Sequence, residues 1–428
     1  MKKSFIPGLL CLLLGAAGFA QSRPPRPNIV FILADDLGYG DVGAFGATDI
    51  RTPNIDGLAR RGIKFTQFYS PSPVCSPARA GFLTGRYPRR MGIDGVFFPE
   101  SFTGLPAAEV TVAESLKEKG YATALVGKWH LGHHRPYLPR QHGFDEYFGI
   151  PYSNDMQGVV YLRGNEVAAY KVDQRLTTQV YTEEAVEFIG KHKQGPFFLY
   201  LAHTMPHVPL YASEAFRGKS KRGLYGDVVE ELDWSVGQVL EALRKHGLEE
   251  NTLVVFSSDN GPWLAFDVEG GSAGPLREGK QTTFEGGMRV PTVACWPGKI
   301  AAGSVYDGLA TTFDWLPTFL RLAGGGAYAP KKPLDGEDIT PVLTGTGTRK
   351  GDELLYYFGG QLQAYRKGDW KIKFPYAGNQ GITGMKDLAP HDTLLFNLRQ
   401  DVGERTNLLE AHPEKVRELL AALRTYQA

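Results

Sequence analysis

Apolar residues in this chain form short unbroken runs and longer helical repeats, and the two patterns alternate along most of the sequence. The runs Asn28–Ala34 and Thr252–Phe256 are rich in aliphatic and β-branched residues, and aspartate follows each of them closely. Such runs predict buried strands. Shorter runs at Ala122–Val126 and Phe197–Leu201 predict two more.

Between these runs, apolar residues recur at the spacing of an α-helix. The segments that show this spacing are Val112–Lys119, Thr182–Lys191 and Tyr225–Lys245. Strands that alternate with helices predict an α/β fold with a mainly parallel central sheet flanked by helices.

The composition changes near residue 345, where the stretch Thr344-Gly345-Thr346-Gly347 suits a linker. Beyond it, Leu354–Phe358 and Trp370–Phe374 predict short strands, and Pro413–Tyr426 predicts a closing helix. We therefore expect a main domain over residues 21–345 and a smaller C-terminal α+β subdomain over residues 346–428, with an antiparallel sheet and a helix.

The first twenty residues have the pattern of an export signal. Lys2 and Lys3 precede the apolar run Ile6–Ala20, which ends in the small-residue pattern Gly18-Phe19-Ala20. This run is too short to cross a bilayer as a helix, and no later run is long enough. The sequence predicts a cleaved signal peptide at residues 1–20, a secreted or periplasmic protein, and no membrane span.

The net charge gives no indication of a nucleic-acid partner, and the cysteine count limits the number of disulfides. The 47 Lys and Arg nearly balance the 46 Asp and Glu, so no basic excess indicates a nucleic-acid partner. Of the three cysteines, Cys11 leaves with the signal, so the exported chain retains Cys75 and Cys295. One disulfide is possible but a disulfide framework is not, and Cys295 lies in an apolar run typical of the core.

Polar residues follow the two longest predicted strands. Asp35 and Asp36 come directly after the first, and Asp259 and Asn260 follow the other. Because ligands bind at the carboxyl ends of parallel strands, we expect these side chains to meet in a crevice. Four oxygen donors suit Ca²⁺ or Mg²⁺ rather than zinc. The alternative is that both pairs are only turn and capping residues.

Cys75 lies at the predicted start of another helix. Pro77 fits a first helical turn with Ser76 or Cys75 at the cap, which places Cys75 at an N-terminus that favours anions. Arg79, four residues later, shares its face and offers a planar fork to an oxyanion. The alternative is a capped surface helix with an incidental cysteine.

Other cationic and proton-transferring groups are Lys128, His130, His207 and Lys280. On a strand-like stretch, Lys128 and His130 would project to the same side. Each of these residues taken singly also fits an ordinary polar surface. His130 with His133 and His134 suggests zinc only weakly, because the cluster lacks a regular helix and nearby thiolates.

The residues Cys75-Ser76-Pro77-Ala78-Arg79, followed by Leu83-Thr84-Gly85-Arg86, match the C-x-P-x-R…LTGR signature of type I sulfatases, the formylglycine-dependent members of the alkaline phosphatase superfamily. Matching segments cover nearly the whole mature chain, including Gly127-Lys128-Trp129-His130 and Asp259-Asn260-Gly261. The residues 149–155 and 278–287 most resemble the branch of arylsulfatase A and N-acetylgalactosamine-6-sulfatase. The resemblance implies an alkaline-phosphatase-like fold.

The resemblance also implies the cofactors. Cys75 would be oxidised by a separate maturation enzyme to formylglycine (3-oxoalanine), whose hydrated aldehyde attacks sulfur and later expels sulfate as the aldehyde forms again. One Ca²⁺ would be held by positions matching Asp35, Asp36, Asp259, Asn260 and the modified Cys75. It would polarise the sulfate and help to ionise the nucleophile.

Further roles carry over by position. Arg79, Lys128 and Lys280 match residues that hold the nucleophile and the sulfate oxygens, and Ser153 matches a serine that contacts sulfate. His130 matches the group that takes a proton from the second hydroxyl. His207 matches the histidine beside the leaving-group oxygen, which either it or Lys280 would protonate.

The sequence thus predicts an exported, calcium-dependent sulfatase acting on a sulfated small molecule or glycan, and on aryl sulfates in vitro. The chain lacks the cysteines for the disulfides of the human lysosomal relatives, and its loops between Tyr152 and Tyr181 are short. The resemblance therefore extends to the sulfate subsite and not to the substrate. The alternatives are a phosphonate or phosphodiester hydrolase and a non-catalytic glycan-binding protein.

Overall fold

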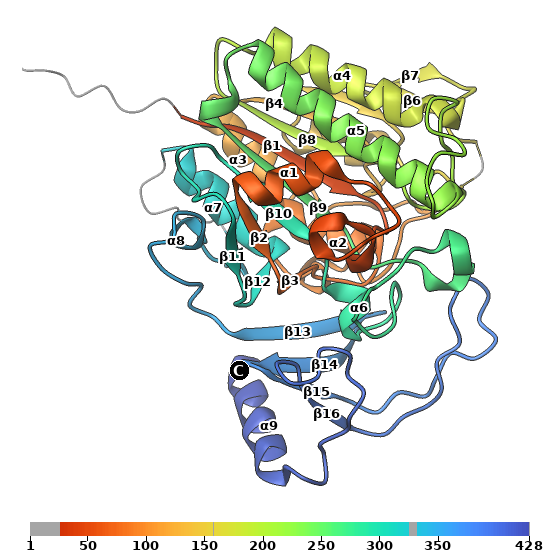
Figure 1. The fold of residues 1–428 in the computed structure, drawn as a ribbon, viewed down its shortest axis with the longest axis vertical. Helices are drawn as coiled ribbons and strands as arrows, with labels where there is room; N and C mark the ends of the chain where they lie inside the picture. The colour runs from red at the N-terminus through yellow and green to blue at the C-terminus, as the bar shows by residue number, and fades with distance from the viewer. Residues whose placement is uncertain (1–25, 157, 325–331, 428) are drawn as a thin grey trace, which may run out of the picture.

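The fold is built on one large central sheet, seen in a computed structural model that describes residues 26–156, 158–324 and 332–427 (Figure 1). Five neighbouring strands at its centre, from β9 to β5, run parallel, and the remaining strands extend it on both sides in mixed directions. Across the sheet the order is β11 (Ser304–Tyr306), β2 (Ile63–Phe65), β10 (Thr292–Cys295), β9 (Thr252–Ser258), β1 (Asn28–Ala34), β8 (Phe197–Ala202), β4 (Ala122–Gly127), β5 (Glu146–Gly149), β6 (Tyr161–Arg163) and β7 (Glu166–Ala169).

Helices cover both faces of this sheet. One face packs against α2 (Cys75–Thr84), α3 (Val112–Glu118), α7 (Trp315–Leu322) and the short α8 (Thr340–Leu343). The other packs against α1 (Pro53–Arg61), α4 (Thr177–Lys191) and α5 (Leu224–Lys245). Successive strand residues point to opposite faces, so Phe31 enters the first core and Ile32 the second. This two-sided burial explains why the central strands are continuous apolar runs.

The C-terminal residues form a smaller unit beside the main sheet (Figure 1). Its antiparallel strands are β13 (Glu353–Phe358), β14 (Gln361–Lys367), β15 (Trp370–Lys373) and β16 (Leu394–Asn397), and α9 (Pro413–Gln427) contributes to its core. This core also contains residues of β3 (Phe68–Tyr69) and α6 (Glu285–Met288) from the main part. β3 itself pairs with β12 (Ala310–Thr311).

The fold class predicted from the sequence is confirmed. β1 has the predicted bounds, and the other three predicted strands of the main sheet run one or two residues further. The helix predicted from Thr182 begins earlier, at Thr177. The pattern missed β14, whose sequence QLQAYRK mixes polar and apolar residues because only part of the strand is buried.

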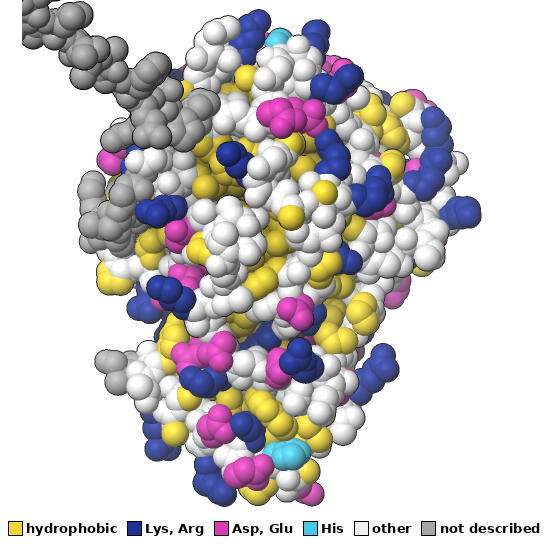
Figure 2. Space-filling model, turned by 60° about the vertical axis from the view of Figure 1, so that its left-hand side comes forward, with side chains coloured by type: hydrophobic (Ala, Val, Ile, Leu, Met, Phe, Trp, Pro, Cys, Tyr) yellow, Lys and Arg dark blue, Asp and Glu magenta, His cyan; other side chains and the backbone are white. Residues whose placement is uncertain are grey.

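Two other expectations concern the cysteines and the termini. Cys75 and Cys295 are both buried and unpaired, so the possible disulfide does not form. The predicted signal peptide lies outside the described residues. Within the described ranges, no helix combines the length and apolar character needed to cross a bilayer. The face in Figure 2 mixes basic with acidic side chains, in keeping with a formal net charge of +1.

Candidate active site

The carboxyl edge of the parallel strands carries the cluster of acidic groups. Asp35 and Asp36 directly follow β1, and Asp259 and Asn260 follow the neighbouring β9. The backbone N–H of Asp36 donates to Asp259 Oδ1 at 3.1 Å, and Asn260 Nδ2 donates to Asp36 Oδ1 at 2.7 Å. The four side chains thus meet as predicted. All four side chains are at most 3% exposed. Residues that only cap exposed turns need no such burial, so this observation argues against the turn-and-capping alternative.

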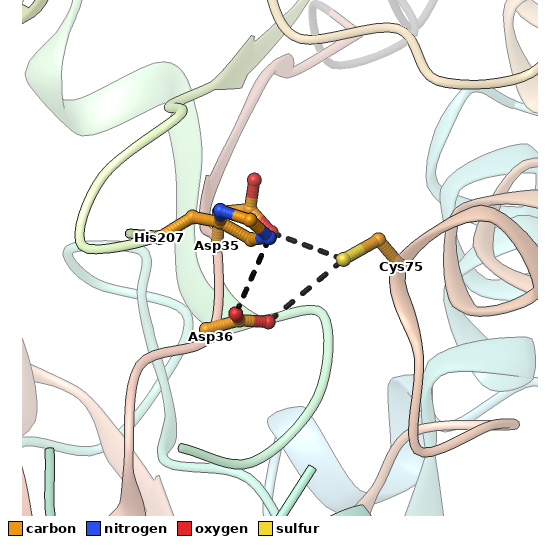
Figure 3. Close-up of side chains that lie close together, drawn as sticks. All are labelled: Asp35, Asp36, Cys75 and His207. Carbon is orange, nitrogen blue, oxygen red and sulfur yellow. Dashed lines mark hydrogen bonds and ion pairs between the residues drawn. The ribbon is translucent and has the colours of Figure 1, made fainter. Parts of the chain in front are cut away.

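Cys75 faces this cluster from the start of α2 (Figure 3). Its Sγ lies 3.3 Å from Asp35 Oδ1 and 3.8 Å from Asp36 Oδ1. The predicted cap is wrong by one residue: Val74 is the N-cap and Cys75 is the first helical residue. The surface-helix alternative is also wrong, because every residue of α2 is buried.

Three cationic side chains pair with the three carboxylates. Arg79 Nε and Nη2 donate to Asp259 Oδ2 at 3.1 and 2.9 Å. Lys128 Nζ donates to Asp35 Oδ2 at 2.5 Å and to Ser153 Oγ at 3.0 Å. Lys280 Nζ donates to Asp36 Oδ2 at 2.7 Å. These formal charges cancel within the site.

The two predicted histidines differ in the nitrogen they present. His130 Nε2 lies 2.9 Å from the carbonyl oxygen of Phe97 and donates to it, which leaves Nδ1 buried without a partner. His207 uses Nδ1, 2.6 Å from the carbonyl oxygen of Val208, so Nε2 faces Asp36 Oδ2 at 3.6 Å (Figure 3).

The strand-like stretch expected for Lys128 and His130 is not formed. β4 ends at Gly127, and His130 has a left-handed backbone with φ +59°. Asp36 shares this conformation at φ +63°. Residues other than glycine rarely adopt it, and such conformations cluster at functional sites. A zinc site on His130, His133 and His134 finds no support in the described ranges, where those side chains form no group of close ligand atoms.

Burial and charge set the protonation of these groups. Burial raises the pKa of the Cys75 thiol well above its usual value, and the carboxylate of Asp35 raises it further. Burial lowers the pKa of His207, assisted by Lys280 and Lys128, and burial with Lys128 does the same for His130. Both imidazoles are therefore neutral at pH 7, and Cys75 is a poor nucleophile as a thiol.

The carboxyl groups of the site differ in pKa, with Asp35 below and Asp259 above the usual value. Burial opposes ionisation of Asp35, but Lys128 and Arg79 outweigh it and hold the pKa of Asp35 well below its usual range. Burial and the neighbouring Asp35 raise the pKa of Asp259 to about 7. Such crowding of acidic groups is relieved by a bound cation.

The donor set fits a metal ion. Asn260 Oδ1 is buried without a hydrogen-bond partner, and it is the amide oxygen that a hard cation takes as ligand. Ligand atoms of Asp35, Asp36, Cys75 and His207 all lie within 4.8 Å of one another. The metal ligands predicted from the sequence also include Asp35, Asp36 and Cys75, but they have Asp259 and Asn260 in place of His207.

One residue at this site was not anticipated from the sequence. Trp263 directly follows Asn260-Gly261-Pro262, and its ring lies beside Lys280 and His207. The sequence feature that could have identified Trp263 is its position close after the acidic motif Asp259-Asn260. A tryptophan at that position is also consistent with an ordinary core residue, so this feature alone does not predict a site residue.

A cavity of about 1340 Å³ lies elsewhere in the molecule. It adjoins Asn28, Pro196 and Asn251, at the amino ends of β1, β8 and β9. The candidate site occupies the opposite, carboxyl edge, so this cavity is not part of it.

Comparison with known proteins agrees with this geometry. The family model "Sulfatase" matches residues 27–325, and "C-terminal region of aryl-sulfatase" matches residues 349–428. N-acetylgalactosamine-6-sulfatase of Canis lupus familiaris is 40% identical over 95% of this chain and 86% of its own length. Arylsulfatase A of Homo sapiens is 40% identical over 97% of this chain and 89% of its own.

Among solved structures, a chain described under the metabolism of multiple glycosaminoglycans by Bacteroides thetaiotaomicron superimposes with a TM-score of 0.86 and 30% identity. The match covers 94% of this chain and 99% of that one.

Proposed function

Since the chain belongs to the sulfatase family and is a sulfuric ester hydrolase, we propose a more specific function for it. It is an exported, calcium-dependent enzyme that removes sulfate from sugars or glycans. Its nucleophile is formylglycine, made from Cys75 by a maturation enzyme. The observation that carries this proposal is the convergence of three carboxylates and three cations on the buried Cys75.

The modified residue would supply a hydrated aldehyde, whose hydroxyl is a better nucleophile than the buried thiol. The position of Cys75 at the first turn of α2 favours an anionic substrate, because backbone N–H groups there point toward it. The buried Arg79 and Lys128 both pair with Asp35, which lies beside Cys75 Sγ. This supports a role for both in holding sulfate oxygens as charge builds on them.

Asp35, Asp36, Asp259 and Asn260, with the modified Cys75, would hold the calcium ion, which polarises the sulfate. Because the protein charges already cancel, a divalent cation would leave the site with a net positive charge. A sulfate monoester carries one negative charge, so the metal-loaded site would attract it.

The two histidines take different parts in proton transfer. His130 presents a buried, unpartnered Nδ1, so it is suited to accept a proton from the nucleophile's second hydroxyl. Neutral His207 turns a lone pair on Nε2 toward the site, because Nδ1–H is held by Val208. Lys280 is the protonated group of the two, so we assign it as the proton donor to the leaving alcohol. His207 lies next to Lys280, beside the leaving-group oxygen.

The substrate assignment rests on the relatives and on Ser153. Ser153 is 1% exposed and accepts a hydrogen bond from Lys128, and this contact supports a role for its hydroxyl at the sulfate subsite. N-acetylgalactosamine-6-sulfatase acts, by its name, on a sulfated amino sugar. Sulfated glycans are therefore the proposed natural substrates and aryl sulfates are proposed substrates in vitro.

Two further parts of the proposal concern the chain as a whole. Lys2, Lys3 and the apolar run after them support export to the periplasm or the medium. We also place the boundary between the catalytic domain and the C-terminal subdomain at residue 345, a position supported by the gap between the two family matches.

The test is peptide mass combined with turnover. Protein made together with a maturation enzyme should show the mass change of thiol-to-aldehyde conversion at Cys75 and should hydrolyse an aryl sulfate. Cys75→Ala should abolish turnover, whereas Cys295→Ala, at the other buried cysteine, should retain it. An unmodified Cys75 with no turnover would favour the glycan-binding alternative, and faster turnover of a phosphodiester would favour the phosphodiesterase.

A further inference from the structure

Trp263 lies against both groups that flank the proposed leaving-group oxygen. Lys280 Nζ is 3.9 Å from the centroid of the Trp263 ring, well within the range of a cation–π interaction. The ring of His207 is 5.2 Å away between centroids, at 57° to it. The indole is partly buried, so solvent screens this contact less than it would on an open surface.

The backbone holds Trp263 and Lys280 together independently of their side chains. The N–H of Lys280 donates to the carbonyl of Pro262 at 2.8 Å. A Cβ on Gly279 would stand 2.2 Å from that same oxygen, so the close approach of the two segments requires glycine there. The indole therefore has a fixed place relative to the root of the Lys280 side chain.

The C-terminal subdomain holds the other edge of the indole. Trp263 Nε1 donates to the carbonyl oxygen of Gly384 at 2.7 Å, in the loop between β15 and β16. Phe266 contacts the ring edge-on at 4.7 Å between centroids. The ring is thus fixed from the catalytic domain on one side and from the C-terminal loop on the other.

We propose that Trp263 is a positioning residue for Lys280, and that the C-terminal loop acts on proton transfer to the leaving alcohol through it. This inference rests on the proposed function. Among the described residues, the Lys280 ammonium has two close side-chain contacts, Asp36 and the Trp263 ring. A metal ion bound by Asp36 would share that carboxylate, and the indole face would then hold the ammonium in place.

The position of a proton donor matters most when the leaving group is a strong base. A good leaving group such as 4-nitrophenolate departs with little protonation, whereas phenolate or a sugar alkoxide depends on it. Loss of Trp263 should therefore harm poor leaving groups selectively. A merely structural role would lower the turnover of all substrates by the same factor.

The experiment compares converted wild type, Trp263→Leu, Trp263→Phe and the control Trp234→Leu on 4-nitrophenyl sulfate and phenyl sulfate. Trp234 is a partly buried tryptophan of α5 that contacts Phe216, so it matches Trp263 in type and burial. Trp263→Leu should lower kcat/KM for phenyl sulfate about tenfold more than for 4-nitrophenyl sulfate, the size of one well-placed cation–π contact. Trp263→Phe keeps an aromatic face and should lose less. Trp234→Leu should keep the wild-type ratio. Equal losses on both substrates, or a Trp234→Leu ratio like that of Trp263→Leu, would overturn the proposal.

A second readout does not depend on turnover. Lys280→Met should change the tryptophan emission of the protein, and the same substitution in a Trp263→Phe background should not. An unchanged emission in the wild-type background would contradict the contact. If converted wild type hydrolyses neither sulfate, the proposed function itself fails, and the role given to Trp263 fails with it.

Discussion

At the scale of single residues, the site is defined by how its charges pair. Asp36 pairs with Lys280, Asp259 with Arg79, and Asp35 with Lys128 and, at 3.5 Å, also with Arg79. All of these groups are buried. Asn260 Oδ1 remains without a partner beside them. A buried oxygen without a hydrogen bond costs stability unless something binds it, so the arrangement favours an added cation.

Calcium should therefore stabilise the folded chain even when Cys75 is unconverted. We expect roughly 3 kcal/mol at a calcium concentration one hundred times the dissociation constant, because the ion binds the folded state alone. The measurement is the thermal midpoint with calcium and with chelator.

The matched variants for this prediction are Asp35→Asn, which removes a ligand, and Asp94→Asn, at a half-exposed acid that pairs with Arg89. The first should abolish the calcium-dependent shift and the second should keep it. Identical midpoints with calcium and with chelator would contradict the metal assignment.

At the scale of elements, the C-terminal sheet is joined to the catalytic part by buried ion pairs. Lys371 of β15 lies between Glu285 of α6 and Glu404, with Nζ 2.9 Å from each carboxylate, and all three side chains are fully buried. Glu404 also accepts from the backbone N–H of Glu285 at 2.6 Å. Burial alone would raise the pKa of Glu285, but Lys371 and Arg289 lower it to about 2.

Lys371→Met should destabilise the protein by about 3–5 kcal/mol, because Glu404 would remain buried without its ion-pair partner and Glu285 would retain only the longer pair with Arg289 at 3.6 Å. The control is Lys367→Met in the neighbouring β14, whose pairing with Glu353 is partly exposed and should contribute less than about 1 kcal/mol. Urea unfolding measures both. Equal small losses would show that Lys371 does not hold the two parts together.

At the scale of the whole molecule, each face of the central sheet buries a neutral histidine. His142 stacks on Trp129 in one core, and neither of its ring nitrogens has a partner. His203 packs on Tyr181 in the other and contacts Ser235. Burial lowers the pKa of His142 to about 4 and that of His203 to about 3.

These two histidines should contribute stability that is lost in mild acid, whereas Asp41, Asp233 and Asp259, whose pKa values burial raises, act in the opposite direction. An unfolded histidine binds a proton below about pH 6.5 and the folded ones do not, so the contribution of the histidines is full above that pH. It is lost as the pH falls toward 4 and 3. We expect each histidine to remove roughly 1–2 kcal/mol between pH 7 and pH 5.

Urea unfolding at the two pH values tests this prediction. Between pH 7 and pH 5, His142→Phe should lose roughly 1–2 kcal/mol less stability than the wild type, whereas His412→Phe, at a partly exposed position, should behave as the wild type does. A pH dependence of the free energy of unfolding that is the same in His142→Phe as in the wild type would rule out this role for His142.

The sequence by itself determined four neighbouring strands of the main sheet, the acidic strand ends and the family. β1 could be read in full because both of its faces are buried, which makes its apolar run continuous. The acidic pairs could be placed together because parallel strands bring their carboxyl ends to one edge. The cysteine motif was specific enough to name the family, and the family match bears it out.

Only the tertiary structure decided which side chains pair. Lys128 and Asp35 are 93 residues apart, and the indole of Trp263 and the carbonyl of Gly384 are 121 apart. The sequence also did not predict the left-handed backbone at His130 or the two carboxylates that pair with the buried Lys371. The physical reason is that periodicity records whether a residue is buried, whereas the choice of partner depends on how distant segments pack.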